Sequence, residues 1–565
     1  MKQNHRRRST RARSVLSVCM TLGAVALAST AWADGLDHAQ AEHMRLLGHN
    51  DMQNRPIYQP TVHKYPTHTA KMGSTAADAY ASKTIFFAGL HAATGGGGCT
   101  GSLPNPLNGG ACEKDGTLIV DATNPTDPVV IKHLPPANPA NALAQMVRVC
   151  DGQDGKLGQT GHVYMLRNDG SGGGNGQHDV YDVTDPVNPV LLSVPVSGLT
   201  ATHKSWWECE TGIAWIVAGA NAPQAPNPDG WKTNQHVKLF DLSDPSHPVY
   251  IRDIGLVGQN PGSTTEATSG GIHGPYIALA NPLTGETVNR AYMPYGTSEL
   301  GTLQVVDRLK VLPDFTTSAG QHIAGTWDGL GTARAQAPTD DDMKAIVIGS
   351  MLMTPTEGAH SACPVFNTAL KHFQGFTSYT TRDYVQLISE EVDNHCSGAP
   401  HFGYMVDVTR DKTGKGADGI SGEMRPMVIS TMQVFEDSAK PDYCTRGTRF
   451  GNHSCNEALA SVPSTFFAPD FGKLTYIAYF DGGARVFDIR DPYHPLEVAH
   501  YVAPVHPLAY GEQPPNVING QLVHDVSHNN LEEDSNGLIY SVDRLGYGMD
   551  ILMLMPPAAL IRNTP

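Results

Sequence analysis

Residues 484–495 read ARVFDIRDPYHP, the clearest copy of a unit that recurs along the chain. Three further clear copies are LIVDATNPTDP at 118–128, VYDVTDPVNP at 180–189 and LFDLSDPSHP at 239–248. Each begins with β-branched and apolar residues, which favour a buried strand, and closes on an aspartate followed by a proline turn. A second apolar run follows the turn, so the unit predicts two antiparallel strands joined by a tight loop.

Degenerate copies surround Asp307, Asp407 and Asp543, which brings the number of copies to seven. A repeat of about 40–50 residues with four short strands is typical of a propeller blade, and loop insertions explain the longer steps seen here. The sequence therefore predicts an all-β fold, a seven-bladed β-propeller at 34–565, with insertions near 310–359 and 408–424. The last blade lacks an outer strand, and we expect residues 43–48 to supply it and so close the ring.

The first 33 residues have the pattern of a secretion signal. Six basic residues precede a mostly apolar stretch at 15–28, and Ala31-Trp32-Ala33 is a small-x-small cleavage site. We therefore expect cleavage after Ala33 and a periplasmic or extracellular protein. The Arg6-Arg7-Arg8 run leaves general secretion and twin-arginine export both open.

Composition limits the partners. The 565 residues carry a formal charge of −16, which becomes −22 when the six basic residues of the signal are removed. A surface this acidic argues against nucleic acid and anionic membranes as partners. No later stretch reaches the roughly 18 apolar residues that a membrane span needs. The glycine-rich segments lack the Gly-Lys-Ser/Thr ending of a phosphate loop, so we expect no nucleotide cofactor. The oligomeric state stays open.

Eight cysteines remain after the signal, and an even number in an exported protein predicts disulfides. We expect Cys99–Cys112 and Cys444–Cys455 as local bridges, and Cys150–Cys209 between neighbouring blades. Thiolate metal ligands are the alternative, but the chain has no C-x-x-C motif.

Aligning the innermost strand of each blade brings histidines to one register. Six of the seven predicted strands carry one there, and the second blade has Gln145 or Met146 instead. Because inner strands surround the propeller axis, we expect these side chains to converge, as neutral imidazoles that suit copper, iron or zinc. The predicted metal ligands are His63, His203, His273, His360, His453 and His528. Histidines kept for blade packing are the alternative interpretation.

Two carboxylates and a further histidine complete the predicted site. Glu457 and Glu532 each lie four residues beyond a register histidine, about 13 Å along the same strand face. Each is therefore expected to orient a neighbouring ligand or to line the channel below. His524 is expected at the channel mouth. We assign these three as the candidate catalytic residues.

The repeated unit, with THKSWWEC at 202–209 and RFGNHS at 449–454, resembles the LVIVD-repeat family of secreted bacterial propellers. A more distant resemblance is to selenium-binding proteins and methanethiol oxidases, which implies a propeller with a histidine-bound metal. Together these features predict a metal-dependent oxidoreductase, containing copper or iron, that acts on a small molecule. The alternative function is a non-catalytic propeller that binds a ligand or a protein on the face formed by the insertions.

Overall fold

The structure is a computed structural model. It describes residues 39–67, 79–93, 95–170, 172–219, 230–233, 235–328, 331–369, 381–393, 396–398, 400–410, 421–434, 443–445, 449–457, 470–504, 516–518, 521–523 and 526–563. The predicted secretion signal and His524 lie outside these ranges. Residues 36–565 form one compact unit, and no helix among the described residues is long and apolar enough to cross a membrane.

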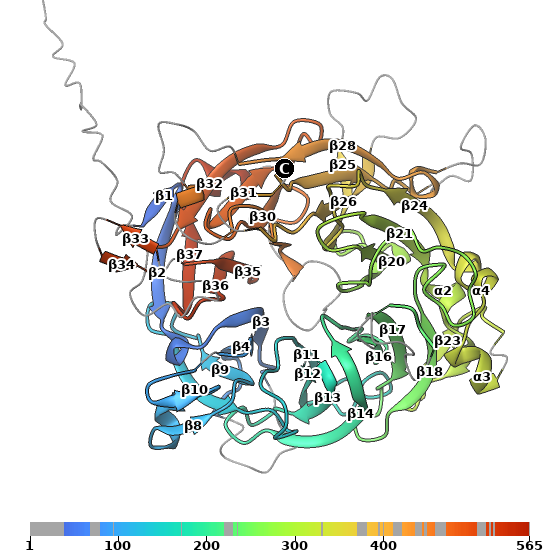
Figure 1. Ribbon diagram of the computed structural model, residues 1–565, viewed down its shortest axis with the longest axis horizontal. Coiled ribbons are helices and arrows are strands. Elements are labelled where there is room, and N and C mark those ends of the chain that lie inside the picture. The colour runs from blue at the N-terminus through green and yellow to red at the C-terminus, as the bar shows by residue number, and fades with distance from the viewer. Residues whose placement is uncertain are drawn as a thin grey trace, which may run out of the picture. The chain divides into compact units, whose positions relative to one another are not determined.

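The fold is all-β, and within this unit antiparallel sheets are arranged around a common centre (Figure 1). The first sheet contains β3 (Ile57–Lys64), β4 (Thr84–Leu90), β9 (Thr117–Asp121) and β10 (Val129–Leu134). Its strands match those predicted from the first copy of the repeat. The match follows from the sequence, because β4 and β9 are continuous apolar runs that are buried on both faces.

The next sheet differs from expectation because it joins two predicted blades. Its strands are β11 (Val147–Asp151), β12 (Val163–Asp169), β13 (Gly172–Asp182), β14 (Val190–Thr202), β15 (Trp206–Trp207), β16 (Ile213–Gly219), β17 (His236–Asp241) and β18 (Val249–Ile254). The 13-residue strand β14 pairs with β13 along most of its length, and its last two residues then pair with β16. Strand β14 is therefore the outer strand of the group β11 to β14, and its last residues also pair with the next group, β15 to β18, through β16.

Two four-stranded sheets follow in chain order. One contains β19 (Tyr276–Ala280), β20 (Thr287–Tyr295), β21 (Thr302–Asp307) and β24 (Val347–Leu352), and the other β25 (Ser361–Ala369), β26 (Thr381–Ile388), β27 (Gly403–Asp407) and β28 (Met427–Met432). Much of the predicted insertion at 310–359 is ordered. It holds the hairpin β22 (Asp314–Thr316) and β23 (His322–Ala324), and the helices α3 (Gly331–Gln336) and α4 (Asp340–Ala345), after α2 (Arg308–Val311). Its last part is β24, a paired strand of the sheet.

The last two sheets contain strands from both ends of the chain. One combines β29 (Ser454–Cys455), β30 (Leu474–Ala478), β31 (Ala484–Asp488) and β32 (Leu496–Val502) with β1 (Gln40–Glu42), and the other combines β35 (His528–Glu533), β36 (Leu538–Asp543) and β37 (Met549–Leu554) with β2 (Met44–Asn50). The antiparallel pairing of β2 with β37 joins the N-terminal region to the C-terminal sheet. Short additions are β5 (Gly95–Gly96), β6 (Cys99–Thr100), β7 (Leu103–Asn105), β8 (Ala111–Glu113), β33 (Asn516–Ile518), β34 (Gln521–Val523) and α5 (Ala558–Arg562), together with the 3-10 turns Met52–Asn54, Pro106–Asn108, Gly422–Met424 and Tyr443–Thr445.

The edge strands nearest the centre contact one another in turn. Strand β3 contacts both β11 and β35, β25 contacts both β19 and β29, and β29 contacts β35. These contacts bring segments far apart in the chain to one place, and they position the site described below.

Four disulfides brace this arrangement. Cys99–Cys112 and Cys150–Cys209 are paired as predicted. The predicted Cys444–Cys455 bridge is wrong: Cys455 pairs with Cys363, and Cys444 pairs with Cys396. The reason is spatial, because Cys363 and Cys455 lie on the contacting edge strands β25 and β29, whereas nearness in sequence was the basis for the expected pair. Four disulfides are consistent with an oxidising compartment.

Candidate metal centre

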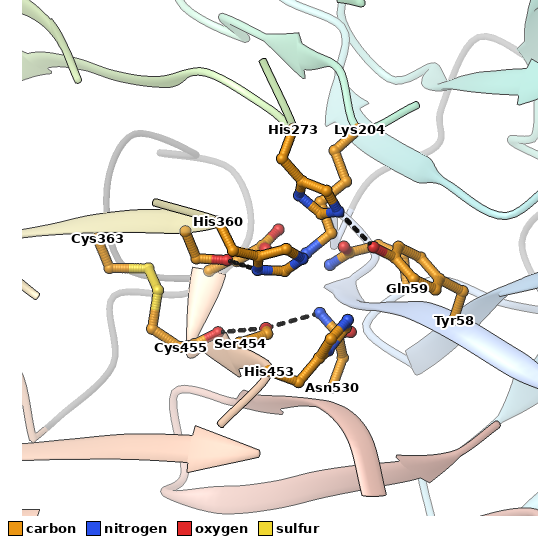
Figure 2. A network of polar contacts seen from close by, with 12 residues as sticks. Tyr58, Gln59, Lys204, His273, His360, Cys363, His453, Ser454, Cys455 and Asn530 are labelled. Carbon is orange, nitrogen blue, oxygen red and sulfur yellow. Dashed lines mark hydrogen bonds and ion pairs between the residues drawn. A yellow bond between two sulfur atoms is a disulfide. The ribbon is translucent and has the colours of Figure 1, made fainter. Parts of the chain in front are cut away.

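Four of the predicted histidines meet at the centre. The ring centroids of His203 and His273 are 4.1 Å apart, those of His273 and His360 3.5 Å, and those of His360 and His453 4.6 Å. Each residue lies at the point where the chain enters an innermost strand: three residues before β15 and β19, and directly before β25 and β29. The repeat places this entry point at the same depth in successive sheets, so the four imidazoles converge. Figure 2 shows three of them, those of His273, His360 and His453.

His63 is not brought into this cluster. Strand β3 begins at Ile57, so His63 lies near its far end, where Nε2 is 2.7 Å from Oδ1 of Asp151. The residue that takes the central place in this strand is Tyr58. Its ring packs edge-on against the rings of His203 and His453, and its hydroxyl is 2.8 Å from Nε2 of His273. The alignment was therefore displaced by five residues in this strand, an odd number that also exchanges the two faces of the sheet.

His528 is also turned away from the cluster. Its Nε2 accepts a hydrogen bond from the backbone N–H of Ala503, and its Nδ1 is 2.8 Å from the hydroxyl of Ser541. A register shift between residues 528 and 530 explains this, because one irregular step changes which side chains face the centre. Asn529 and Asn530 contact the site instead, through bonds to the Tyr58 carbonyl and the Ser454 hydroxyl.

The sequence interpretation missed Glu390 and His91, and both follow the second strand of a sheet. In an antiparallel pair, the start of the innermost strand lies beside the end of the second strand, as the pairs Ile57–Leu90 and Ser361–Ile388 show. His91 packs edge-on against Tyr58 with ring centroids 4.7 Å apart. Aligning the ends of the second strands, in the same way as the histidines, would have found both residues.

Glu390 lies between two of the imidazoles. Its Oε2 is 3.6 Å from Nε2 of His360, its Oε1 is 3.7 Å from Nε2 of His453, and its Oε1 also accepts a hydrogen bond of 3.1 Å from Arg449. One potential ligand atom each from His273, His360 and Glu390 lies within 4.8 Å of the others. Two ligands of one tetrahedral ion, each at about 2.1 Å, are about 3.4 Å apart, so these separations match a shared cation.

The imidazoles carry nitrogens that have no hydrogen-bond partner among the described residues. These buried atoms are Nε2 of His91, Nδ1 of His203, Nδ1 of His273, Nε2 of His360 and Nε2 of His453. Buried polar atoms are almost always paired in folded proteins, so a group of unpaired ones needs an explanation. Those of His360 and His453 lie beside the Glu390 carboxylate, and imidazole nitrogens next to a carboxylate are suitable ligands for a cation.

The protonation of His453 can be assigned from its neighbours. Its Nδ1 lies at a hydrogen-bond distance from the backbone carbonyl of Asn529, which only accepts, so Nδ1 carries the proton. Burial, reinforced by the positive charge of Lys204, lowers the pKa of His453 well below its ordinary value. Its Nε2 is therefore a bare lone pair that faces a carboxylate oxygen, an arrangement of two acceptors that a bound cation would stabilise.

The other imidazoles share this neutral state for the same reason. Burial lowers the pKa of His203 to about 3, with a further contribution from Lys204, and lowers the pKa values of His273 and His360 well below the ordinary value. Neutral imidazole is the form that binds metal ions.

A second polar layer is held together by ion pairs. Glu457 accepts bonds from Lys204 at 2.6 Å, from Arg148 at 2.8 Å and from the Tyr276 hydroxyl at 2.9 Å. Burial alone would raise the pKa of Glu457, but the two cations outweigh it and lower the pKa to about 2. Glu457 is thus a counter-ion for Lys204 and Arg148, and it takes no part in the unpaired cluster.

Glu532 also lies away from the imidazoles. Its Oε2 accepts a bond of 2.6 Å from the backbone N–H of Val62, and burial raises its pKa to about 8. It is therefore protonated at neutral pH.

Comparison with known proteins adds no family. No model of a known protein family matches the chain, and no curated protein matches it. Among solved structures, a putative 6-phosphogluconolactonase from Bacteroides fragilis is 11% identical over 77% of this chain and 88% of its own, with a TM-score of 0.37. Sqt1 from Chaetomium thermophilum, bound to the N-terminus of ribosomal protein L10, is 10% identical over 90% of this chain and 99% of its own, with a TM-score of 0.40. At these TM-scores the similarities carry no argument about this chain, and the LVIVD resemblance remains an expectation from sequence.

Proposed function

We propose that the protein is an exported metal-dependent oxidoreductase whose metal is held at the centre of a seven-bladed β-propeller. The single observation that carries the proposal is the group of neutral imidazoles with unpaired nitrogens around the carboxylate of Glu390. Buried histidines outside the cluster, such as His63 and His178, also have one nitrogen without a hydrogen-bond partner among the described residues. The proposal therefore rests on the convergence of several such nitrogens with one carboxylate, which packing histidines would not require.

The strand pairing supports the blade count. Dividing the eight-stranded sheet where β14 passes to β16 gives seven groups of four strands, with β1 added outside one of them. Strand β2 is then the outer strand of the last blade and closes the ring through its pairing with β37. Deletion of residues 34–50 tests closure: it should lower the melting temperature by several degrees, and an unchanged melting temperature would contradict it.

His273, His360 and Glu390 are the proposed ligands, with His453 next to them. Two histidines and one carboxylate hold non-haem iron(II) and also catalytic zinc, and the redox role that we propose favours iron, because zinc has no redox chemistry. When bound, the ion would supply a redox-active Lewis acid. Tyr58 fixes the ring of His273 through Nε2, the carbonyl of Asn529 fixes that of His453, and Arg449 holds Glu390. Such outer contacts orient ligands and set the nitrogen that faces the ion.

Access for a small molecule is proposed beside Arg449. Its side chain is about one-fifth exposed while it bonds the buried carboxylate of Glu390, so it connects the surface to the cluster. The guanidinium groups of Arg449 and Arg544 both lie within 6 Å of the Phe480 ring centroid, at 5.5 and 5.7 Å. This entrance is cationic although the chain as a whole is acidic.

Elemental analysis of the purified protein tests the proposal. We expect about one equivalent of a transition metal in the wild type, strongly reduced in Glu390→Gln and His360→Gln. His63→Gln is the matched control, since His63 is equally buried but lies outside the cluster. A wild-type protein that binds no transition metal on reconstitution would refute the proposal and leave a binding propeller as the remaining function.

A further inference from the structure

A buried arginine without a counter-ion lies under the insertion that precedes β24. Arg252, on β18, is 1% exposed, and its Nη1 donates a bond of 3.3 Å to the carbonyl of Val311. Its Nε and Nη2 have no partner among the described residues. Among the described residues, no carboxylate lies within 4 Å of the Arg252 guanidinium. An unpaired buried charge is strongly unfavourable.

Three carboxylates act electrostatically on Arg252, those of Asp342, Asp253 and the exposed Asp328, and the first two are bonded to other cations. Asp342 accepts two bonds from Arg334, at 2.9 and 2.5 Å, and Asp253 is paired with Lys238 at 2.8 Å. Burial lowers the pKa of Arg252 to about 10, which still leaves it charged at neutral pH. Arg252 therefore keeps its positive charge, and no anion among the described residues is paired with it.

A tryptophan connects this charge to a cavity. The guanidinium carbon of Arg252 lies 4.1 Å from the ring centroid of Trp327, and the indole Nε1 is also buried and unpaired among the described residues. Trp327 is at the same time a wall of a cavity of about 540 Å³ between β18 and the insertion. This volume is within the range of small-molecule sites.

The other residues that line the cavity indicate which kind of ligand it would bind. Ile251, Pro313, Phe315 and Ala335 are apolar, and the carboxylate of Asp241 already accepts bonds from the backbone and hydroxyl of Ser318. The unsatisfied groups are all donors: two nitrogens of a cation and one indole N–H. An apolar chamber with donors at one end matches a small organic carboxylate.

We propose that this cavity is a second ligand site, which binds a small carboxylate with an apolar body and presents it to Arg252 and Trp327. The guanidinium fork binds carboxylates in a bidentate manner. Because the Arg252 guanidinium packs against the indole ring and does not itself line the cavity, the anion reaches it only when the Trp327 side chain tilts. Binding is therefore coupled to the surroundings of this tryptophan, and the site is independent of the central metal.

Benzoate and its uncharged analogue benzamide, added to the full chain, test the proposal. We expect benzoate to raise the melting temperature and to change the tryptophan fluorescence, and benzamide to do neither at about 10 mM. Arg252→Met should weaken benzoate binding by about tenfold or more, and Trp327→Phe, which keeps the ring and loses the N–H, by less. Arg252→Met removes an unpaired buried charge, so we expect it to fold.

Arg449→Gln distinguishes this cavity from the cationic entrance to the centre. It should leave benzoate binding unchanged. Equal binding of benzoate and benzamide, no binding of benzoate, or a loss that follows Arg449→Gln and spares both Arg252→Met and Trp327→Phe, would each overturn the proposal.

Discussion

Two polar groups of similar burial lie side by side at the centre of this protein, and they differ in whether their atoms are paired. In the ionic group, Glu457 is bonded by Lys204, Arg148 and Tyr276. In the histidine group, five imidazole nitrogens are unpaired among the described residues, and two of them, Nε2 of His360 and Nε2 of His453, face the carboxylate of Glu390. Pairing explains the first group as structural, and the unpaired atoms of the second group are the basis for the metal site that we propose.

The largest expected effect is on the ionic group. Glu457→Gln leaves two buried cations with one neutral acceptor, so the free energy of unfolding should fall by about 3–5 kcal/mol. Denaturation with guanidinium measures it. Asp244→Asn, in an exposed pair with His247, is the control and should change the value by less than about 0.5 kcal/mol. A loss that small in Glu457→Gln would show that the ionic group is not structural.

The disulfide between β25 and β29 should affect both stability and the histidine group. Cys363 lies three residues after His360, and Cys455 lies two after His453. Replacing both cysteines by serine should cost about 2–5 kcal/mol and weaken metal binding, measured by competition with a chelator. Replacing Cys99 and Cys112 is the control, since that bridge closes a loop away from the histidines. Equal metal affinity in the two variants would contradict the coupling.

Glu532 predicts a pH dependence of stability. Its pKa is about 8 in the folded protein and close to the ordinary 4.5 when unfolded, so the folded state binds the extra proton between these values. The contribution of Glu532 to the free energy of unfolding should therefore be most favourable below about pH 4.5. It should fall by up to about 1.4 kcal/mol per pH unit as the pH rises to about 8. Glu532→Gln should remove this slope. An identical slope in wild type and variant would refute the assignment.

The smallest effect is expected for a histidine with an unpaired nitrogen. In metal-free protein, His360→Gln removes one hydrogen bond, that of Nδ1 with the Ser361 hydroxyl, and none at Nε2, so the free energy of unfolding should change by no more than about 1.5 kcal/mol. Thermal unfolding in the presence of a chelator checks this. A loss as large as that of Glu457→Gln would mean that His360 is structural, and the contrast between the two groups would disappear.

The sequence predicted more of the sheets than of the site. The repeat unit predicted the strand that ends on Asp121, which is β9, because a strand's apolar run is a local property. The sequence misplaced His63 and His528 because the direction in which a side chain points depends on where its strand starts, as in β3, and on register shifts within the strand, as in β35. Glu390 was missed because only the innermost strands were aligned, whereas the Cys363–Cys455 bridge depends on a contact between sheets, which no local pattern encodes.

The central claim is tested most directly by anomalous X-ray scattering from a crystal of the metal-reconstituted protein. The account predicts one strong peak about 2.0–2.2 Å from a nitrogen of His273, from Nε2 of His360 and from a carboxylate oxygen of Glu390. A peak bound by other residues, or ordered imidazoles with no peak between them, would contradict it.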